Sequence, residues 1–261
     1  MSLWLSYPGT DIKWECKPTI FPDKTSQVWH IPEIFIRIGG NVRISWYFEQ
    51  ESEFMWLVQL VGLLQSHDMQ PELYVPYLPY GRQDKDIDNN STFAGYSFCR
   101  LINRLELKDI ITEDAHSERF LGYIHWDRSK VANAVTQVVL DKEIDSLLYP
   151  DKGALDKYVK VMENLHIPYS ALHKSRCQET GILKIDPIPE DVKYHYVDKK
   201  ILIVDDICDG GATFIEAAKL LYDAGASEVH LYVSHGLFSK GQQILFDAGI
   251  KSITTLEYDK P

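Results

Sequence analysis

Two adjacent carboxylates, Asp205 and Asp206, stand where an aliphatic run meets a run of small residues. The string reads Ile201-Leu-Ile-Val-Asp-Asp-Ile-Cys-Asp-Gly-Gly-Ala-Thr213, which predicts a buried strand, a loop and a helix that starts near Thr213. Backbone N–H groups in such a loop, with the positive end of a helix dipole behind them, form a site for an anion. Carboxylates at the strand end suit ribose hydroxyls or Mg²⁺. A generic Asp-Gly-Gly is more often an ordinary capped turn, but the whole string favours a phosphate-binding loop.

Four further segments carry charged or imidazole side chains in loops and turns. Alone, each is more often structural, as a solvated loop, a common turn or an exposed face. Their combination in one fixed order is far more specific than any single segment. The segments are Tyr77-Leu-Pro-Tyr-Gly-Arg-Gln-Asp-Lys85, Ile111-Thr-Glu-Asp-Ala-His116, Tyr149-Pro-Asp-Lys-Gly-Ala154 and His173-Lys-Ser-Arg176.

The string over 201–213 resembles the phosphoribosyl-diphosphate (PRPP) loop of the type I phosphoribosyltransferase superfamily. The four other segments resemble motifs of the PRPP synthetases, a branch of that superfamily, and the Arg-Gln-Asp at 82–84 is absent from transferases that consume PRPP. The resemblance covers roughly residues 20–256. It implies an ATP-dependent diphosphokinase that uses Mg²⁺ and acts on a ribose 5-phosphate-type acceptor. It also implies a homo-oligomer.

The resemblance gives each matched residue a role. Lys174 and Arg176 would be catalytic, beside the transferring phosphates, while His116 and Asp151 would bind the metal. Two larger sets would bind the substrates: Phe21, Asp23, Arg82, Gln83, Asp84 and His116 the ATP, and Asp205, Asp206, Asp209, Gly210, Gly211, Ala212 and Thr213 the ribose phosphate.

The sequence departs from the family pattern near both ends. Only about ten residues separate the first strand from Phe21-Pro-Asp-Lys-Thr25, so the helix that the family has there is expected to be missing. Thr25 stands where the family has Glu, in a segment that reaches the ATP of a neighbouring subunit. The family's C-terminal strand and helix are also expected to be absent.

The elements that must position these residues alternate along the chain. Short apolar runs followed by helical stretches of about 10–13 residues are typical of crossover units on a parallel sheet. We therefore expect an α/β fold with two type I phosphoribosyltransferase-like domains, each a mostly parallel sheet flanked by helices. A boundary near residues 120–145 would separate an ATP-binding domain over 1–125 from a ribose-phosphate-binding domain over 126–261.

The expected strands are Leu3–Ser6, Ile34–Ile38, Val42–Phe48, Leu73–Pro76, Asp109–Thr112, Ser146–Tyr149, Ile201–Val204, Val229–Val233 and Ser252–Leu256. The expected helices are Glu53–Gln65, Thr92–Arg104, Leu155–Asn164, Thr213–Ala224 and Ser239–Asp247. The stretch Ile182–Lys199, rich in Pro, Asp and Lys, is expected to form an irregular excursion or a hairpin.

Composition excludes several classes of protein. The 261 residues carry 38 acidic side chains against 27 Lys and Arg, and a net charge of −11 argues against general nucleic-acid binding. No run approaches about 18 apolar residues, so no membrane span is expected, and the first residues do not resemble a signal peptide. The cysteines, at 16, 99, 177 and 208, are too scattered for a zinc site or a disulfide framework. A reduced, cytoplasmic protein is expected.

The resemblance leaves the acceptor and the class of protein open. Ribose 5-phosphate is the first choice, and ADP-ribose is the second because it also has a ribose with a free C1 hydroxyl and a phosphoryl group on C5. A phosphoribosyltransferase that uses PRPP would not need the segment at 82–84. A non-catalytic regulatory homologue would be expected to lose the cations or the acids, yet Lys174, Arg176, Asp205 and Asp206 are present.

Overall fold

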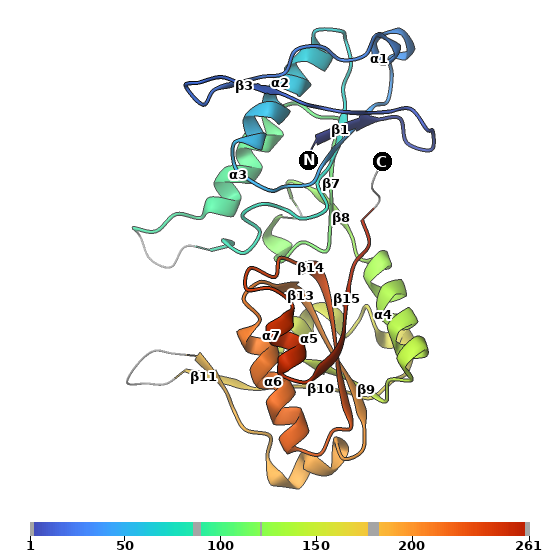
Figure 1. Cartoon of the computed structure of the whole chain (residues 1–261), viewed down its shortest axis with the longest axis vertical. Coiled ribbons are helices and arrows are strands. Elements are labelled where there is room, and N and C mark those ends of the chain that lie inside the picture. The colour runs from blue at the N-terminus through green and yellow to red at the C-terminus, as the bar shows by residue number, and fades with distance from the viewer. Residues whose placement is uncertain (1–2, 86–89, 121, 177–182, 259–261) are drawn as a thin grey trace. The chain divides into compact units, whose positions relative to one another are not determined.

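The chain divides after Asp127 into two compact units, each with its own sheet (Figure 1). The structure, a computed structural model, describes residues 3–85, 90–120, 122–176 and 183–258. The sequence-based boundary between residues 125 and 126 falls close to this division. Among the described residues, no helix is long and apolar enough to cross a membrane.

The first unit is built on a six-stranded sheet with the order β2-β1-β5-β6-β7-β8. Strands β5 to β8 pair in parallel, whereas β1 is antiparallel to both β2 and β5. The strands are β1 Leu3–Ser6, β2 Lys13–Glu15, β5 Arg43–Trp46, β6 Glu72–Tyr74, β7 Asp109–Glu113 and β8 His125–Asp127, and a separate hairpin joins β3 Thr19–Ile20 to β4 Ser26–Gln27. The helices are α1 Glu33–Ile38, α2 Glu53–Gln65 and α3 Ala94–Asn103, with a 3₁₀ turn η1 at Glu118–Phe120.

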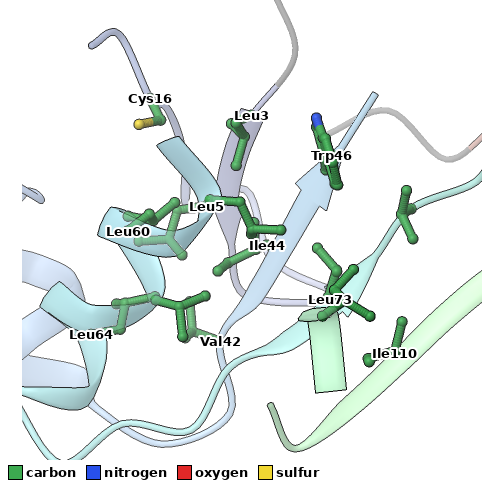
Figure 2. Packing of buried hydrophobic residues seen from close by; sticks show 14 of the residues in the cluster. Leu3, Leu5, Cys16, Val42, Ile44, Trp46, Leu60, Leu64, Leu73 and Ile110 are labelled. Carbon is green, nitrogen blue, oxygen red and sulfur yellow. The ribbon is translucent and has the colours of Figure 1, made fainter. Parts of the chain in front are cut away.

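Helix α2 forms because its apolar residues recur at helical spacing on one face. Leu57, Leu60, Val61 and Leu64 are all buried. They belong to the same apolar cluster as the strand residues, and Figure 2 shows Leu60 and Leu64 beside the side chains of the sheet. Burying each such side chain contributes about 1.5–3 kcal/mol to folding.

The predicted strand at Ile34–Ile38 is wrong, because these residues lie in the helix α1. The β-branched residues suggested a strand, but Pro32 precedes the helix and the left-handed Gly39 ends it. Phe35 alone is buried, while the three isoleucines are exposed. About one and a half turns of helix are enough to place the Phe35 ring in the core.

The second unit is built on a five-stranded, fully parallel sheet with the order β10-β9-β13-β14-β15. Its strands are β9 Ser146–Tyr149, β10 Tyr169–Ala171, β13 Lys200–Cys208, β14 Glu228–Gly236 and β15 Ile250–Thr255, and β11 Lys174–Arg176 pairs with β12 Leu183–Ile185 in a separate hairpin. Its helices are α4 Ser129–Lys142, α5 Lys152–Tyr158, α6 Ala212–Asp223 and α7 Gln243–Asp247, with 3₁₀ turns η2 Glu163–Leu165 and η3 Glu190–His195.

Helices cover both faces of this sheet, and the central strand β13 contributes side chains to the apolar cluster on each face. Ile201 and Ile203 pack in the cluster with α6 and α7, whereas Leu202 and Val204 pack in the cluster with α4 and α5. Figure 1 shows α6 and α7 on one side of the sheet and α4 on the other. A continuous aliphatic run is therefore what this strand requires, since alternate residues face opposite buried layers.

Helix α4 was not expected, because its residues fall within the predicted boundary between the two halves. Val131, Val135 and Val138 have helical spacing and are buried, so a pattern that predicts the helix is present. The structure thus confirms the α/β fold with two mostly parallel sheets and corrects the elements around the boundary.

Candidate active site

The acid pair of the second unit lies inside β13, because that strand extends to Cys208 and not only to Val204. Asp206 is buried, and its Oδ2 accepts a hydrogen bond from Lys157 Nζ at 2.9 Å. The side chains of Lys157 and Asp206 are 10% and 7% exposed. The predicted strand ended at Val204 and left both acids beyond it, whereas Asp206 lies within β13 and is covered by α5.

Asp205 has a different environment from its neighbour. Burial raises the pKa of its carboxyl group to about 8, and the nearby carboxylates of Asp206 and Asp151 add to the rise. The backbone N–H of Asp206, 2.9 Å from Asp205 Oδ1, opposes it. The protonated form is therefore favoured at neutral pH, and a cation bound beside the carboxyl group would restore its charge.

This raised pKa predicts how the stability of the metal-free protein depends on pH. Between about pH 4 and pH 8 the unfolded chain loses the Asp205 proton while the folded protein keeps it, so the free energy of unfolding falls as the pH rises. Denaturant unfolding in EDTA at several pH values should show a shallower fall for Asp205→Asn than for the unchanged protein. Equal slopes in the two proteins would contradict the assignment.

The loop after β13 has the backbone that the sequence predicted. Gly211 has a φ of 77°, and α6 begins at Ala212, directly after it. A Cβ atom on Gly211 would lie 3.0 Å from Leu245 Cδ2, so the turn is packed from behind. The first N–H groups of α6 have no acceptor within the helix and lie at this loop, as an anion site requires. The loop residues Asp209, Gly210 and Thr213 are half-buried, and Ala212 is exposed.

Lys240 is a basic residue of this site that sequence reasoning missed. A Cβ atom on Gly210 would lie 3.6 Å from Lys240 Cε and 3.7 Å from its Cδ, so the lysine stem runs beside the loop. The two residues are far apart in the sequence and are joined through β14. No short-range pattern could have paired them.

Asp151, the candidate metal ligand, is the N-cap of α5. Its Oδ1 accepts a hydrogen bond from the backbone N–H of Ala154 at 3.0 Å. The same carboxylate contributes to the raised pKa of Asp205, so the structure brings these two predicted site residues together.

The predicted catalytic cations lie on a hairpin of the second unit. The backbone of Lys174–Arg176 forms β11 and pairs with β12, and the N–H of Asp186 donates to the carbonyl of His173 at 2.8 Å. The side chains of Lys174 and Arg176 lie outside the described part of the structure. Their catalytic role stays a prediction.

In the first unit, the segment Tyr80–Asp84 is a structured turn. Tyr80 has a φ of 62°, its hydroxyl donates a hydrogen bond to Glu51, and its ring lies 5.1 Å from that of Phe98. The backbone N–H of Gln83 donates to the carbonyl of Tyr80 at 2.9 Å. Arg82 and Gln83 are exposed on this turn, so their side chains can reach a ligand.

His116 lies next to this turn. A Cβ atom on Gly81 would come within 3.9 Å of His116 Cβ, so the two predicted ATP-binding segments are neighbours. His116 is exposed and follows two buried acids, of which Glu113 accepts a hydrogen bond from Tyr74 at 3.0 Å. Arg119 Nη1 donates a hydrogen bond to the backbone carbonyl of Asp84 at 3.0 Å.

Phe21 and Asp23 lie on the separate turn between β3 and β4. Asp23 Oδ1 accepts hydrogen bonds from the N–H and the hydroxyl of Thr25, at 3.0 and 2.7 Å, and these lower the pKa of Asp23. Thr25 therefore has a structural role in this turn. The contact of Phe21 and Asp23 with ATP stays a prediction.

The donor set of the second unit fits Mg²⁺. Among the described residues, no cluster of three or more His, Cys, Asp or Glu side chains is placed to hold a metal ion. Mg²⁺ is usually held by one or two carboxylates together with substrate phosphates, so Asp151 and Asp205 suffice as the protein's share. Both are hard oxygen donors, and Asp205 is the group whose buried charge a cation would offset.

Known proteins match both the fold and the sequence. A family model described as the phosphoribosyl transferase domain matches residues 129–260. The crystal structure of phosphoribosylpyrophosphate synthetase from Mycobacterium smegmatis matches 92% of this chain and 79% of its own chain, with a TM-score of 0.74 and 20% identity. The two proteins therefore share their fold.

Two sequence relatives carry the same name. The ribose-phosphate pyrophosphokinase of Sulfurisphaera tokodaii is 30% identical over 242 residues, which are 90% of this chain and 81% of that protein. The ribose-phosphate pyrophosphokinase of Thermococcus kodakarensis is 30% identical over 218 residues, which are 80% of this chain and 76% of that protein. This chain therefore belongs to the ribose-phosphate pyrophosphokinase family.

Proposed function

We propose that this protein transfers the β,γ-diphosphoryl group of ATP to the C1 hydroxyl of ribose 5-phosphate and so forms PRPP and AMP. The observation that carries the proposal is the loop at 209–213, which follows an acid-bearing strand and opens α6 in the unit that matches the phosphoribosyl transferase domain. The names of the sequence relatives support the same reaction.

In the proposed reaction, the C1 oxygen of the acceptor forms a bond to the β-phosphorus of ATP. The bond from that phosphorus to the oxygen that bridges to the α-phosphate breaks, AMP leaves with the bridging oxygen, and the C1 hydroxyl proton is released. Charge spreads over the phosphoryl oxygens, so the protein contributes mainly positioning and electrostatic stabilisation.

The residues of the chain divide this work. The N–H groups of 209–213 hold the acceptor's 5-phosphate, and Asp205 and Asp209 bind its hydroxyls. Lys174 and Arg176 stabilise the charge on the transferring group, while Arg82, Gln83, Asp84 and His116 bind ATP together with Phe21 and Asp23. Asp151 and Asp205 in the second unit, and His116 in the first, would bind Mg²⁺ together with the substrate phosphates, and the ion would neutralise part of their charge.

ADP-ribose is the second candidate acceptor, and the position of Lys240 favours it. ADP-ribose carries a second phosphoryl group beyond the C5 phosphate. The Lys240 stem lies beside Gly210, so its ammonium group is available to a phosphate next to the one in the loop. Gly210, Gly211 and the exposed Ala212 add little side-chain bulk around that path.

The identity of the nucleotide released from ATP tests the proposed reaction. With ATP, Mg²⁺ and ribose 5-phosphate, we expect AMP and a sugar that has gained a diphosphate, both identified by mass, and no AMP when either Mg²⁺ or the sugar is omitted. Release of ADP would indicate transfer of the γ-phosphoryl group and would contradict the proposal. If no nucleotide is consumed with any acceptor, the protein is a non-catalytic homologue.

Competition between the two acceptors tests the choice of substrate. At equal concentrations, ribose 5-phosphate should gain a diphosphate with the higher kcat/KM. Conversion of ADP-ribose alone would make the second candidate correct. Lys240→Ala should then lower kcat/KM for ADP-ribose more than for ribose 5-phosphate.

We also propose that the protein acts in the cytoplasm as a homo-oligomer, as its resemblance to the PRPP synthetases implies. Light scattering behind a gel-filtration column would measure the mass of the particle, and a mass of one chain at micromolar concentration would refute the oligomer.

A further inference from the structure

The ion pair between Lys157 and Asp206 joins two parts of the proposed site. Lys157 lies on α5, the helix that Asp151 caps, and Asp206 lies on β13 next to Asp205. Nζ and Oδ2 are 2.9 Å apart, and both side chains are about nine-tenths buried. The pair therefore ties the element that carries one predicted site carboxylate to the element that carries another.

The surroundings of the pair contain several negative charges. The carboxylates of Asp151 and Asp206 both act on Asp205, and Lys157 is the cation that opposes them there. The ammonium group also lies 5.2 Å from the centre of the Tyr158 ring, whose side chain is fully buried. Lys157 is thus held in one place, with its charge beside the carboxylate of Asp206.

Stability alone does not explain such a pair. Taking two charges out of water has a cost that their attraction only partly offsets, so a buried ion pair is often replaceable by apolar residues without loss of stability. Helix α5 has other anchors, since Ala154 and Tyr158 are buried against the same layer as β9 and β13. The benefit of the pair must therefore be sought in the placement of the acids.

We propose that Lys157 is a positioning residue: by holding Asp206 it fixes α5 on β13 and so sets Asp151 and Asp205 at the separation that the bound substrates and Mg²⁺ require. This inference rests on the proposed diphosphokinase function. It assigns no direct contact with substrate to Lys157.

A double-mutant cycle over Lys157→Met, Asp206→Asn and the combined variant tests the proposal. Lys157→Met should lower kcat for AMP release by about 10–100-fold, as loss of a supporting partner does at other sites. Because Lys157 acts through Asp206, the combined variant should match Asp206→Asn within about twofold instead of showing the product of the two losses. Lys157→Arg keeps the charge and should recover part of kcat.

The matched control is Lys200→Met. Lys200 begins the same strand, β13, and pairs with Glu143 at 3.0 Å at the opposite end of the strand from the acids. This variant should keep the kcat and the KM of the unchanged protein. If Lys157→Met also keeps both and only its melting temperature falls, the pair is structural and the proposal is wrong.

Hydrogen exchange tests whether Lys157 fixes α5 on β13, and it does not require a measurement of activity. Lys157→Met should speed amide exchange in α5 and in residues 205–213 and leave the strands of the first unit unchanged. The combined variant no longer leaves a buried carboxylate without its cation, so it keeps the measurement possible if the single variant folds poorly. Unchanged exchange in both regions would overturn the inference. If the unchanged protein releases no AMP, the proposed function fails, while the exchange result still stands for or against the positioning role.

Discussion

Lys174→Ala and Arg176→Ala should each lower kcat by about 10²–10³-fold, while the KM for the acceptor changes far less. A cation beside the transferring phosphoryl group interacts most strongly when negative charge has spread over the oxygens, so its loss appears in kcat. The backbone that carries both residues is a short hairpin, so truncation of the side chains should leave the sheet intact. Steady-state rates of AMP release with each substrate varied measure the effect.

Lys193→Ala is the control for these two variants. Lys193 lies on η3 of the same unit, pairs with Glu190 and is no part of the proposed site. Its kcat should equal that of the unchanged protein. Full turnover in both Lys174→Ala and Arg176→Ala would show that the segment at 173–176 has been aligned with the wrong motif.

The second large effect is expected from substitution of Asp151, which has two proposed roles, as a helix cap and as a ligand of Mg²⁺. Two variants separate these roles. Asparagine caps a helix about as well as aspartate, so Asp151→Asn should keep the hydrogen bond to Ala154 and the stability of the fold. It removes the negative charge, and the Mg²⁺ concentration needed for half-maximal rate should rise by about 10–100-fold or more. Asp151→Ala should show the same loss and should also cost about 1 kcal/mol of folding stability.

Comparison of the two Asp151 variants separates the loss of Mg²⁺ binding from the loss of helix capping. Magnesium titrations of the rate measure the first effect, and denaturant unfolding measures the second. An Asp151→Asn protein with unchanged dependence on Mg²⁺ would show that Asp151 is only a helix cap.

The local sequence pattern predicted those elements whose residues are compatible with only one type of secondary structure. Helix α2 and strand β9 match their expected ranges, because helical spacing and a short aliphatic run each allow a single interpretation. Helix α1 was misread because the same β-branched residues fit a strand when Pro32 and Gly39 are ignored. In α4 the pattern was present at Val131, Val135 and Val138, but an expected domain boundary took precedence over it.

The candidate site was predictable as a set of segments and not as a set of contacts. The order of the motifs identified which residues to consider, and the structure brings Asp151 near Asp205 and His116 near Gly81. Neighbouring residues of a strand face opposite sides, so Asp205 and Asp206 have different roles although they read as one pair. Lys157 pairs with an acid 49 positions away, a contact that only the packing of α5 on the sheet creates.

The acid at Asp205 also bears on how this protein would respond to selection. Its carboxyl group sits in the central strand, between the aliphatic run that holds the sheet together and the loop at 209–213. A library screened only for resistance to heat would therefore favour residues without an acid group at position 205, since the metal-free acid must take up a proton on folding above about pH 4. The same variants would have lost a group that the proposed reaction uses, so stability and turnover should trade off most sharply at this one position. Screening in the presence of ATP, Mg²⁺ and acceptor should reverse the preference, because ligand binding would then reward the native acid.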